Sequence, residues 1–566
     1  MTTVGLLGDS VALEAIRAAL TDTRSETTAT AVDPAAVGQT DVTVVAASTE
    51  TPIFERVGSQ ALETGTPLIS VELGGIGGQA VSGVDAAISG HAPGTACYTC
   101  LRERVTASDP DTDDAGCDDS TARLAGAIAG SELTALVEGD QSSLLGGVIE
   151  LPYTQRRLLP VPYCGCDSED GADPRLRRTN ERRSLEESVT MAEVAFDQRI
   201  GPIASVGEAE SFPVPYYLAT LSGTPFSDAD APKHAAGVGL DWDPAFMKAL
   251  GESLERYSAA IYRTASFETA PEAPVSPDRF VDADWMDSDV TYWHKAEHLQ
   301  TGERVHVPAS LTVFPPPERT IRPAITTGLG LGNGGVDSLC SGLYEVLERD
   351  AAMLAWYSTY EPMALAVEDE GYRTLARRAH SEGLEATALL LTQDVDVPVV
   401  AVCVHREDGW PKFAAGSAAD LDPEAAARGA LEEAIQNWLE LRRMGREDAT
   451  EEGNIGVHAE LPDSVRSFIT PDTTIPAADV GPSESPSGSS ELEALIDRVE
   501  DAGLDAYGAR LTPRDVETIG FEAIRVLIPS AQPLFTGDPY FGDRARTVPE
   551  SLGFEPRLDR MAHPFP

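Results

Sequence analysis

The sequence has 566 residues, of which 92 are acidic, 42 are basic and 42% are hydrophobic, and its formal net charge is −50. This hydrophobic content is enough for folded cores, so it excludes a disordered acidic chain, and the scarcity of basic residues excludes direct binding to a nucleic-acid backbone. Only four of the basic residues are lysines. We interpret this balance as halophilic, an adaptation to a high-salt cytoplasm in which screening weakens self-repulsion.

The length indicates roughly two to four domains. The N-terminal residues 1–16 have no basic region followed by a small-residue cleavage site, and no apolar run reaches the length of a membrane span. Seven cysteines in a chain of this length are not a disulfide framework. We therefore expect a soluble, cytoplasmic protein.

The first 90 residues alternate short strands and helices. We expect strands at 3–8, 41–48 and 67–73 and a helix at 10–20, because each strand is a β-branched run that ends close to Gly or Ser. This alternation predicts a small parallel α/β sheet. The turn at 5–10, Gly-Leu-Leu-Gly-Asp-Ser, has two glycines, which leaves two interpretations: a weak dinucleotide-binding turn, or a plain strand-to-helix turn.

A different pattern begins after the arginine-rich stretch 175–183. We place a domain boundary there, with one α/β domain at 1–185 and a larger α+β domain at 186–566. The polar stretch 481–490, rich in Ser, Gly and Pro, lies between periodic segments, and we expect it to be a surface loop.

Four cysteines form two close pairs. Cys97 and Cys100 have the spacing Cys-x-x-Cys, and Cys164 and Cys166 have the spacing Cys-x-Cys. Two such pairs are what a tetrahedral zinc site needs, since each pair lies on a tight turn and the ion joins two distant segments. The alternatives are unligated or redox-active thiols. We predict a structural zinc site.

Two helical segments carry the same Glu-x-x-Glu-Arg cassette. The first holds Glu252, Glu255 and Arg256, and the second holds Glu345, Glu348 and Arg349. A single cassette of this kind is usually a solvated, ion-paired stripe on a helix. Here the flanking residues are mostly apolar or small, and buried carboxylates must be paired or bind a cation.

A third helix and a glycine run add to the pattern. The third helix places Glu433 and Gln436 at the same i, i+3 spacing, and the run 326–335 contains glycines that would let phosphate approach a helix N-terminus. Clustered carboxylates need divalent cations, and Mg²⁺ is typically held by one or two carboxylates together with substrate phosphates. Because the P-loop sequence is absent, we predict a different kind of nucleotide site.

These residues resemble the YcaO superfamily, and within it the SagD-like azoline-forming cyclodehydratases. The resemblance rests on 249–257, on 293–309, on 430–436, on the C-terminal segments, and on a block at 326–351 that holds Gly328, Gly332, Asn333, Glu345, Glu348 and Arg349. It covers about 190–566. The first domain is similar to the ThiF-like module with a cysteine zinc site that accompanies many of these enzymes.

The resemblance implies an ATP- and Mg²⁺-dependent enzyme that turns ATP into ADP and phosphate. By this resemblance the four cassette glutamates hold Mg²⁺, and Arg256 and Arg349 contact phosphates. Lys248, Glu433 and Gln436 belong to the implied nucleotide site, together with Gly328, Gly332 and Asn333. Two positions depart from the family: Val238 replaces a lysine, and Lys248 replaces a residue that is often serine.

The implied reaction forms an azoline in a ribosomally made precursor peptide, as in bacteriocin biosynthesis. A Cys, Ser or Thr side chain adds to a backbone carbonyl, and the carbonyl oxygen leaves as phosphate. The C-terminal His563 and the terminal carboxylate of Pro566 are the candidate catalytic groups. The alternatives are a thioamide-forming or protein-modifying relative that uses an external sulfur donor, and a non-catalytic scaffold. Expected partners are the peptide, a dehydrogenase or TfuA-like protein, and a second copy in a homodimer.

Overall fold

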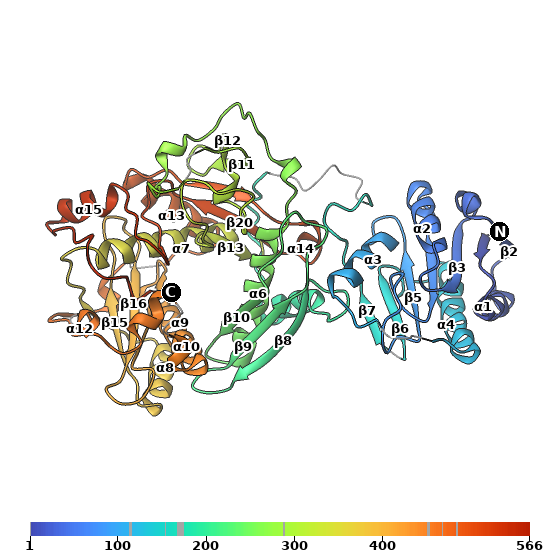
Figure 1. Cartoon of the computed structure of the whole chain (residues 1–566), viewed down its shortest axis with the longest axis horizontal. Helices are drawn as coiled ribbons and strands as arrows, with labels where there is room; N and C mark the ends of the chain where they lie inside the picture. Colours follow the sequence, from blue (N-terminus) through green and yellow to red (C-terminus); the bar gives the residue numbers. More distant parts are fainter. Residues whose placement is uncertain are drawn as a thin grey trace.

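The computed structural model describes residues 2–112, 116–152, 154–166, 175–286, 289–449, 453–466, 468–482 and 485–565. Figure 1 shows a sheet-and-helix unit formed by the N-terminal residues at one end and the larger C-terminal part at the other. Within the described residues, no helix combines the length and the apolar character that a membrane crossing needs.

The N-terminal unit is built on a seven-stranded sheet of order β2-β1-β3-β4-β5-β6-β7. Its first four strands are parallel, and the remaining three pair antiparallel. The strands are β1 (Thr2–Leu7), β2 (Thr27–Ala31), β3 (Val42–Ser48), β4 (Leu68–Leu73), β5 (Ala86–His91), β6 (Gly147–Leu151) and β7 (Thr154–Arg157). The α/β prediction is confirmed, although the sheet is mixed and not fully parallel.

Helices cover both faces of this sheet. Helices α1 (Val11–Thr21) and α4 (Asp119–Glu138) pack on one face, and α2 (Ile53–Thr64) and α3 (Tyr98–Ala107) pack on the other. The two-glycine turn is a strand-to-helix turn: Ser10 caps α1 by accepting from the Ala12 amide. Gly8 has φ +112°, and a Cβ at this position would lie 2.0 Å from the Ala46 carbonyl oxygen, so only glycine fits.

Three further sheets form the C-terminal part. Their orders are β10-β9-β8, β12-β11-β19-β20-β13 and β17-β16-β15-β14-β18. The strands are β8 (Ile203–Glu210), β9 (Tyr216–Leu221), β10 (His234–Val238), β11 (Trp293–His298), β12 (Arg304–Pro308), β13 (Leu329–Gly332), β14 (Ala364–Ala366), β15 (Glu385–Leu390), β16 (Val399–His405), β17 (Phe413–Ala419), β18 (Thr474–Pro476), β19 (Tyr507–Arg510) and β20 (Glu522–Leu527).

Three long helices lie against these sheets and carry the predicted site residues. Helix α6 (Trp242–Ala260) packs on β9 and β10, α7 (Gly335–Trp356) packs on β13 and β20, and α9 (Pro423–Met444) packs on β16 and β17. The other helices are α5 (Leu185–Ala192), α8 (Glu370–Ser381), α10 (Arg446–Ala449), α11 (Gly453–His458), α12 (Asp463–Arg466), α13 (Ser489–Asp501), α14 (Arg514–Thr518) and α15 (Arg544–Leu552).

Each of the three long helices is buried on one side by small and apolar residues. In α6 these include Ala245, Ala249 and Tyr257, which are fully buried and lie four or eight residues apart on one face of the helix. The first glutamate cassette borders this buried face: Glu252 accepts from the Ala236 amide of β10, and Glu255 and Arg256 follow one turn later. The packing of apolar faces on three different sheets therefore directs the polar faces of α6, α7 and α9 toward a shared space.

Candidate active site

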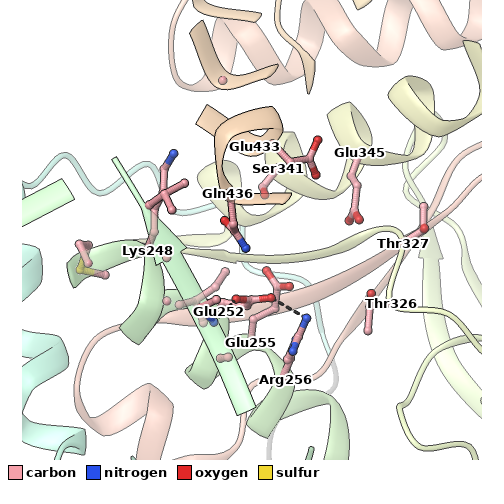
Figure 2. Close-up of a pocket in the computed structure, with 18 of the residues that line it drawn as sticks. Lys248, Glu252, Glu255, Arg256, Thr326, Thr327, Ser341, Glu345, Glu433 and Gln436 are labelled. Carbon is pink, nitrogen blue, oxygen red and sulfur yellow. Dashed lines mark hydrogen bonds and ion pairs between the residues drawn. The ribbon is translucent and has the colours of Figure 1, made fainter. Parts of the chain in front are cut away.

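The polar faces of α6, α7 and α9 meet at a cavity of about 1200 Å³. Figure 2 shows the α6 residues Glu252, Glu255 and Arg256 facing Glu345 of α7 across this cavity. The predicted site residues that line it are Lys248, Glu252, Glu255, Arg256, Gly332, Asn333, Glu345, Arg349, Glu433 and Gln436. Two cassettes separated by about a hundred residues in the chain thus come together in one site.

The α6 cassette is held by contacts with β10. The Glu252 carboxylate accepts from the Ala236 amide at 2.7 Å and pairs with Arg256 at 2.6 Å. Arg256 also donates to the His234 carbonyl oxygen at 2.7 Å. Burial raises the pKa of Glu255 to about 8, and the neighbouring Glu345 and Glu252 carboxylates add to this rise. Burial also raises the pKa of Glu252.

The two glutamates of the α7 cassette lie in different surroundings. Glu345 lines the cavity and accepts from the Gly328 amide at 2.9 Å. Glu348 is 7% exposed, is not among the residues that line the cavity, and accepts from the Ser417 hydroxyl at 2.7 Å. Burial raises the pKa of Glu348 to about 8, although Arg349 at 3.4 Å opposes that rise.

Helix α9 closes the site from a third side. The Glu433 carboxylate accepts from the Ser417 amide at 2.6 Å and lies 3.6 Å from Arg349. Lys248 of α6 forms an ion pair with Glu432 of α9, so this lysine bridges the two helices at the cavity. Burial raises the pKa of Glu433.

The donor set fits a divalent cation and a polyphosphate. Glu252, Glu255 and Glu345 present carboxylate oxygens to one cavity, and hard oxygen ligands of this kind suit Mg²⁺. Burial first, and then the neighbouring Glu345 and Glu252 carboxylates, raise the pKa of Glu255, and a cation between these groups would oppose both effects. Arg256 and Arg349 line the same cavity and can donate to phosphate oxygens.

The glycine run has a different role at its end from the one that the sequence predicts. The first N–H groups of α7 are already bonded: the Gly335 amide donates to Thr179 Oγ1 at 3.2 Å, and the Val336 amide donates to the Thr179 carbonyl at 3.1 Å. A Cβ at Gly335 would lie 1.4 Å from the Arg177 carbonyl oxygen. Thr179 of the linker 175–184 therefore already occupies the first two amides of α7, where the sequence predicts phosphate.

Gly328, near the start of the glycine run 326–335, does contribute to the cavity. Gly328 has φ +90°, and a Cβ there would lie 2.2 Å from the Val526 carbonyl oxygen, so glycine is required where this backbone meets β20. Gly328 does not line the cavity itself but orients Glu345 through its amide.

Sequence reasoning missed several residues that line the cavity. Ser341 lies one turn before Glu345 and Glu440 lies one turn after Gln436, so their i, i+4 spacing was a usable signal. Glu440 accepts from Gln436 at 3.0 Å and from the Tyr216 hydroxyl at 3.1 Å. Further residues without such a signal are Arg183, Thr326 and Thr327.

The C-terminal candidates lie outside this cavity lining or outside the described residues. His563 is fully buried and donates from Nε2 to the Phe535 carbonyl oxygen at 2.7 Å. Burial lowers the pKa of His563 to about 4, so its ring is neutral at neutral pH. Leu534 and Thr536, on either side of Phe535, line the cavity. Pro566 lies outside the described residues.

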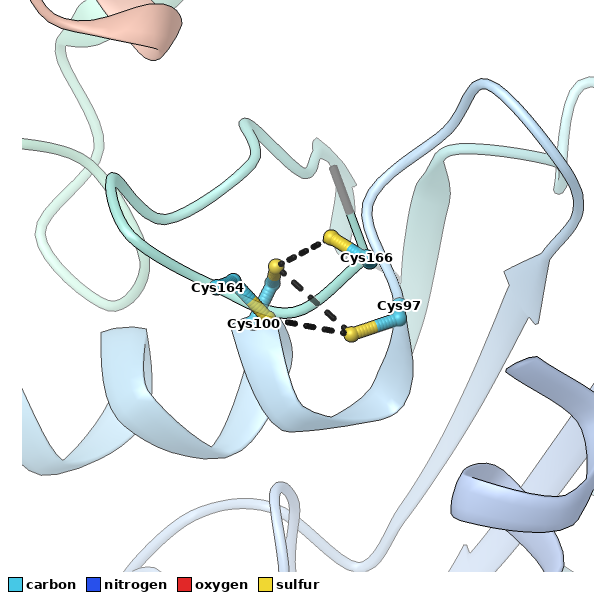
Figure 3. A group of neighbouring side chains, drawn as sticks. All are labelled: Cys97, Cys100, Cys164 and Cys166. Carbon is cyan, nitrogen blue, oxygen red and sulfur yellow. Dashed lines mark hydrogen bonds between the residues drawn. The ribbon is translucent and has the colours of Figure 1, made fainter. Parts of the chain in front are cut away.

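The four predicted cysteines form one cluster in the N-terminal unit (Figure 3). Their sulfurs all lie within 4.8 Å of one another, with contacts of 3.7 Å for Cys97–Cys100 and 3.5 Å for both Cys97–Cys164 and Cys100–Cys166. Zn–S bonds of about 2.3 Å in a tetrahedron place sulfurs about 3.8 Å apart, so the cluster fits zinc.

Two N–H groups point at the sulfurs of this cluster. The Val161 amide donates to Cys100 Sγ at 3.3 Å, and Arg514 donates to Cys166 Sγ at 3.2 Å. Such donors stabilise the thiolate charge that metal binding requires. Because Arg514 belongs to α14, the cluster is also in contact with the C-terminal part of the chain.

The chain is similar in sequence or in structure to several known proteins. An uncharacterized protein of Methanothermobacter thermautotrophicus is 28% identical over 333 residues, which are 54% of this chain and 82% of that protein. A heterocyclase solved in complex with substrate and cofactor matches with a TM-score of 0.74 and 19% identity, over 98% of this chain and 83% of that chain. The heterocyclase TruD matches with a TM-score of 0.67 and 18% identity, over 97% and 81% of the two chains.

The YcaO protein of Methanopyrus kandleri, solved with AMPPCP and Mg²⁺, matches with a TM-score of 0.52 and 24% identity, over 62% of this chain and 91% of that chain. At these identities the solved structures establish a shared fold. The family model described as YcaO cyclodehydratase, ATP- and Mg²⁺-binding, matches residues 236–532, which include all three helices that form the cavity. The chain therefore belongs to the YcaO family of ATP-dependent, Mg²⁺-binding enzymes.

Proposed function

We propose that the protein is a peptide cyclodehydratase that forms azolines in a ribosomally made precursor peptide. A Cys, Ser or Thr side chain of the peptide adds to the preceding backbone carbonyl and forms the ring. The carbonyl oxygen then leaves as phosphate, so the peptide loses one water while ATP becomes ADP and phosphate. ATP supplies the leaving group, since phosphate departs far more readily than hydroxide.

One observation carries this proposal: two Glu-x-x-Glu-Arg helices place Glu252, Glu255 and Glu345 around one cavity. We assign these carboxylates to Mg²⁺ and assign Arg256 and Arg349 to phosphate oxygens. Glu348 is the fourth predicted magnesium ligand. In its present contact with Ser417 it supports the position of Arg349.

The remaining lining residues would bind the rest of the nucleotide and the peptide. We assign Gly332, Asn333, Glu433 and Gln436 to the nucleotide, with Gly328 acting through Glu345. Val238 lines the cavity at the position where relatives carry a lysine, and Lys248 also lines it. We propose that Lys248 provides the positive charge that Val238 does not.

The C-terminal segment would help to shape the peptide side of the cavity. Through its bond to the Phe535 carbonyl, His563 holds the segment that carries Leu534 and Thr536. We keep the terminal carboxylate of Pro566 as the proposed base. His563, which is buried and neutral, is better suited to positioning than to proton transfer.

We further propose that the cysteine cluster binds a structural Zn²⁺ and that residues 1–185 form a ThiF-like module joined to a YcaO domain at 186–566. In this proposal the module docks the precursor peptide or a partner such as a dehydrogenase, and the enzyme works as a homodimer. The buried contacts between α3, α6 and α14 support a fixed arrangement of the two units.

An assay of ATP hydrolysis with Cys-, Ser- and Thr-containing peptides tests the function. The wild type should release phosphate in a peptide-dependent manner, and Glu345→Ala should abolish this release. Glu348→Ala should weaken it. The matched control is Glu493→Ala, an exposed glutamate of α13. Absence of ATP binding by the wild type would leave only the scaffold function.

Mass spectrometry of the treated peptide distinguishes the two enzymatic functions. Loss of one water identifies an azoline. Exchange of one oxygen for sulfur, dependent on a sulfur donor and a TfuA-like protein, would identify a thioamide-forming enzyme and overturn the cyclodehydratase proposal.

A further inference from the structure

Among the described residues, Arg322 is a buried cation without a counter-ion. The residue is only 8% exposed. Within the described residues no carboxylate or carbonyl oxygen accepts from its guanidinium, and the Nε–H in particular has no acceptor. Burial lowers the pKa of Arg322, as expected for a charge removed from water. A buried guanidinium without a partner is strongly unfavourable, so the fold retains Arg322 at a cost that a ligand would offset.

Tyr540 carries a second buried donor. The Tyr540 hydroxyl is buried and has no acceptor among the described residues. Gln532 lines the same small cavity as Arg322 and donates to the Tyr540 carbonyl oxygen at 3.1 Å, so Tyr540 lies next to that cavity.

Arg525 adds a second buried guanidinium. It is 2% exposed and donates from Nη1 and Nη2 to the Thr326 and Ile325 carbonyl oxygens, each at 2.7 Å. Its Nε–H has no acceptor within the described part of the chain. The nearby charge of Arg322 contributes, after burial, to a pKa of about 10 for Arg525. Among the described residues, Arg322 Nε, Arg525 Nε and the Tyr540 hydroxyl therefore all lack an acceptor.

A small cavity adjoins Arg322, and we call it the rear recess. Its volume is about 20 Å³, and it is lined by the polar residues Arg322, Thr327, Arg349 and Gln532 and by apolar side chains that include Val346 and Val526. A void of roughly 10–15 Å³ holds one water molecule, so the recess admits one guest of about that size. Thr327 and Arg349 also line the main cavity, so the recess lies directly behind the site of the proposed chemistry.

The polar lining favours an anion over water. Gln532 is fully engaged: its Oε1 accepts from the Gly542 amide, and its Nε2 donates to the Pro533 and Tyr540 carbonyl oxygens. A water molecule must donate hydrogen bonds as well as accept them, and it leaves the charge of Arg322 uncompensated. An anion accepts from several donors at once and neutralises the guanidinium.

We infer that the rear recess binds one small inorganic anion, held by Arg322. The shared chemistry is that of a compact anion that only accepts hydrogen bonds. Two sources supply such an anion: halide from the surrounding salt, which matches the size of the recess, and phosphate released in turnover, which requires the recess to widen toward the main cavity. The halide source requires no turnover, so the inference stands apart from the proposed function.

A crystal soaked in bromide tests the inference on the unmodified protein. We expect an anomalous difference peak in the rear recess within hydrogen-bond distance of Arg322. Separate crystals are soaked in phosphate. If the recess holds density that shows no anomalous signal after the bromide soak and no tetrahedral shape after the phosphate soak, the guest is water and the inference is overturned. A tetrahedral peak seen only with phosphate would support the anion site and assign its source to turnover.

Thermal unfolding in solution provides a second test of the anion site. At constant ionic strength, replacing gluconate by chloride or bromide should raise the melting temperature of the wild type, because a ligand that binds only the folded state stabilises it. Arg322→Met should lose this shift. The control Arg319→Met, three residues earlier and exposed, should keep it. Equal shifts in the two variants would contradict a site at Arg322.

Discussion

Arg104 of α3 forms an ion pair with Asp515 of α14, and both side chains are at most 1% exposed. The Tyr257 hydroxyl completes the contact by donating to Asp515 at 2.6 Å and accepting from Arg104 at 3.2 Å. Arg104 lies one turn after Cys100 on α3, and Tyr257 directly follows the first glutamate cassette on α6. One buried network thus joins the cysteine cluster to the helix that carries Glu252 and Glu255.

Asp515→Asn should destabilise the protein strongly. The substitution leaves the Arg104 charge buried without its partner, and breaking a buried pair in this way lowers the free energy of unfolding by about 3–5 kcal/mol. Chemical unfolding followed by circular dichroism measures the change. Asp505→Asn is the control, because Asp505 pairs with Arg279 at a more exposed position and should change stability by less than about 1 kcal/mol. Equal effects would show that the network does not hold the two units together.

Stabilisation by Mg²⁺ should depend on pH. The pKa of Glu255 is about 8 in the folded protein, against about 4.3 for an unperturbed glutamate. Because the folded value is the higher one, the cation-free protein loses stability as pH rises from about 4 through 8. In the proposed site Mg²⁺ binds the deprotonated carboxylates, which would remove this loss.

The measurement is the rise in melting temperature caused by Mg²⁺ with a non-hydrolysable ATP analogue. We expect a larger rise at pH 8.5 than at pH 6, and a much smaller difference in Glu255→Gln. Glu493→Gln should behave as the wild type does. A rise that is independent of pH would argue against Glu255 as a magnesium ligand.

Cys164→Ser should reduce bound zinc from about one ion per chain to a small fraction, because three thiolates do not complete a structural site. Elemental analysis of purified protein measures the content. Cys117→Ser is the matched control, since Cys117 is not part of the cluster. Arg514→Met should keep the metal but lower its affinity about tenfold or more, because it removes a donor to Cys166. Full zinc content in Cys164→Ser would contradict the site.

Gly328→Ala should abolish ATP hydrolysis while leaving a folded but less stable protein. The substitution forces a Cβ against the Val526 carbonyl at a positive φ, and it shifts the amide that orients Glu345. Gly383→Ala is a control with a similar φ of +78° and open space around it, so it reports the effect of backbone strain alone. Phosphate release and melting temperature are measured together. Normal activity in Gly328→Ala would remove the glycine from the site.

The sequence was sufficient to predict most of the carboxylates and arginines that gather at the cavity, because its repeated cassettes specify residue types and helical spacing. It could not predict which neighbouring strand or helix packs on each side of a given helix. Glu345 and Glu348 lie three residues apart, yet Glu345 faces the cavity and Glu348 faces Ser417 on β17. That difference arises from how α7 packs between two sheets, and a one-helix pattern does not encode it.

The same reasoning explains what was missed in the N-terminal unit. Strands with runs of large apolar residues were recognised, whereas β2 is a short edge strand of Thr and Ala that is partly exposed and has no such run. Arg183 reaches the cavity from the linker, and Thr179 covers α7, although both precede the predicted boundary. Contacts of this kind depend on the path of the chain between elements, which local sequence patterns do not reveal.

The cover that Thr179 places over α7 has a consequence for modular evolution of this protein. A catalytic part that began at residue 186 would lack the linker segment that fills the space beside Gly335. The first amides of α7, which carries residues of the active site, would then lose the hydrogen bonds that Thr179 accepts. Exchange of N-terminal modules between relatives should therefore succeed only when residues 175–184 travel with the catalytic part.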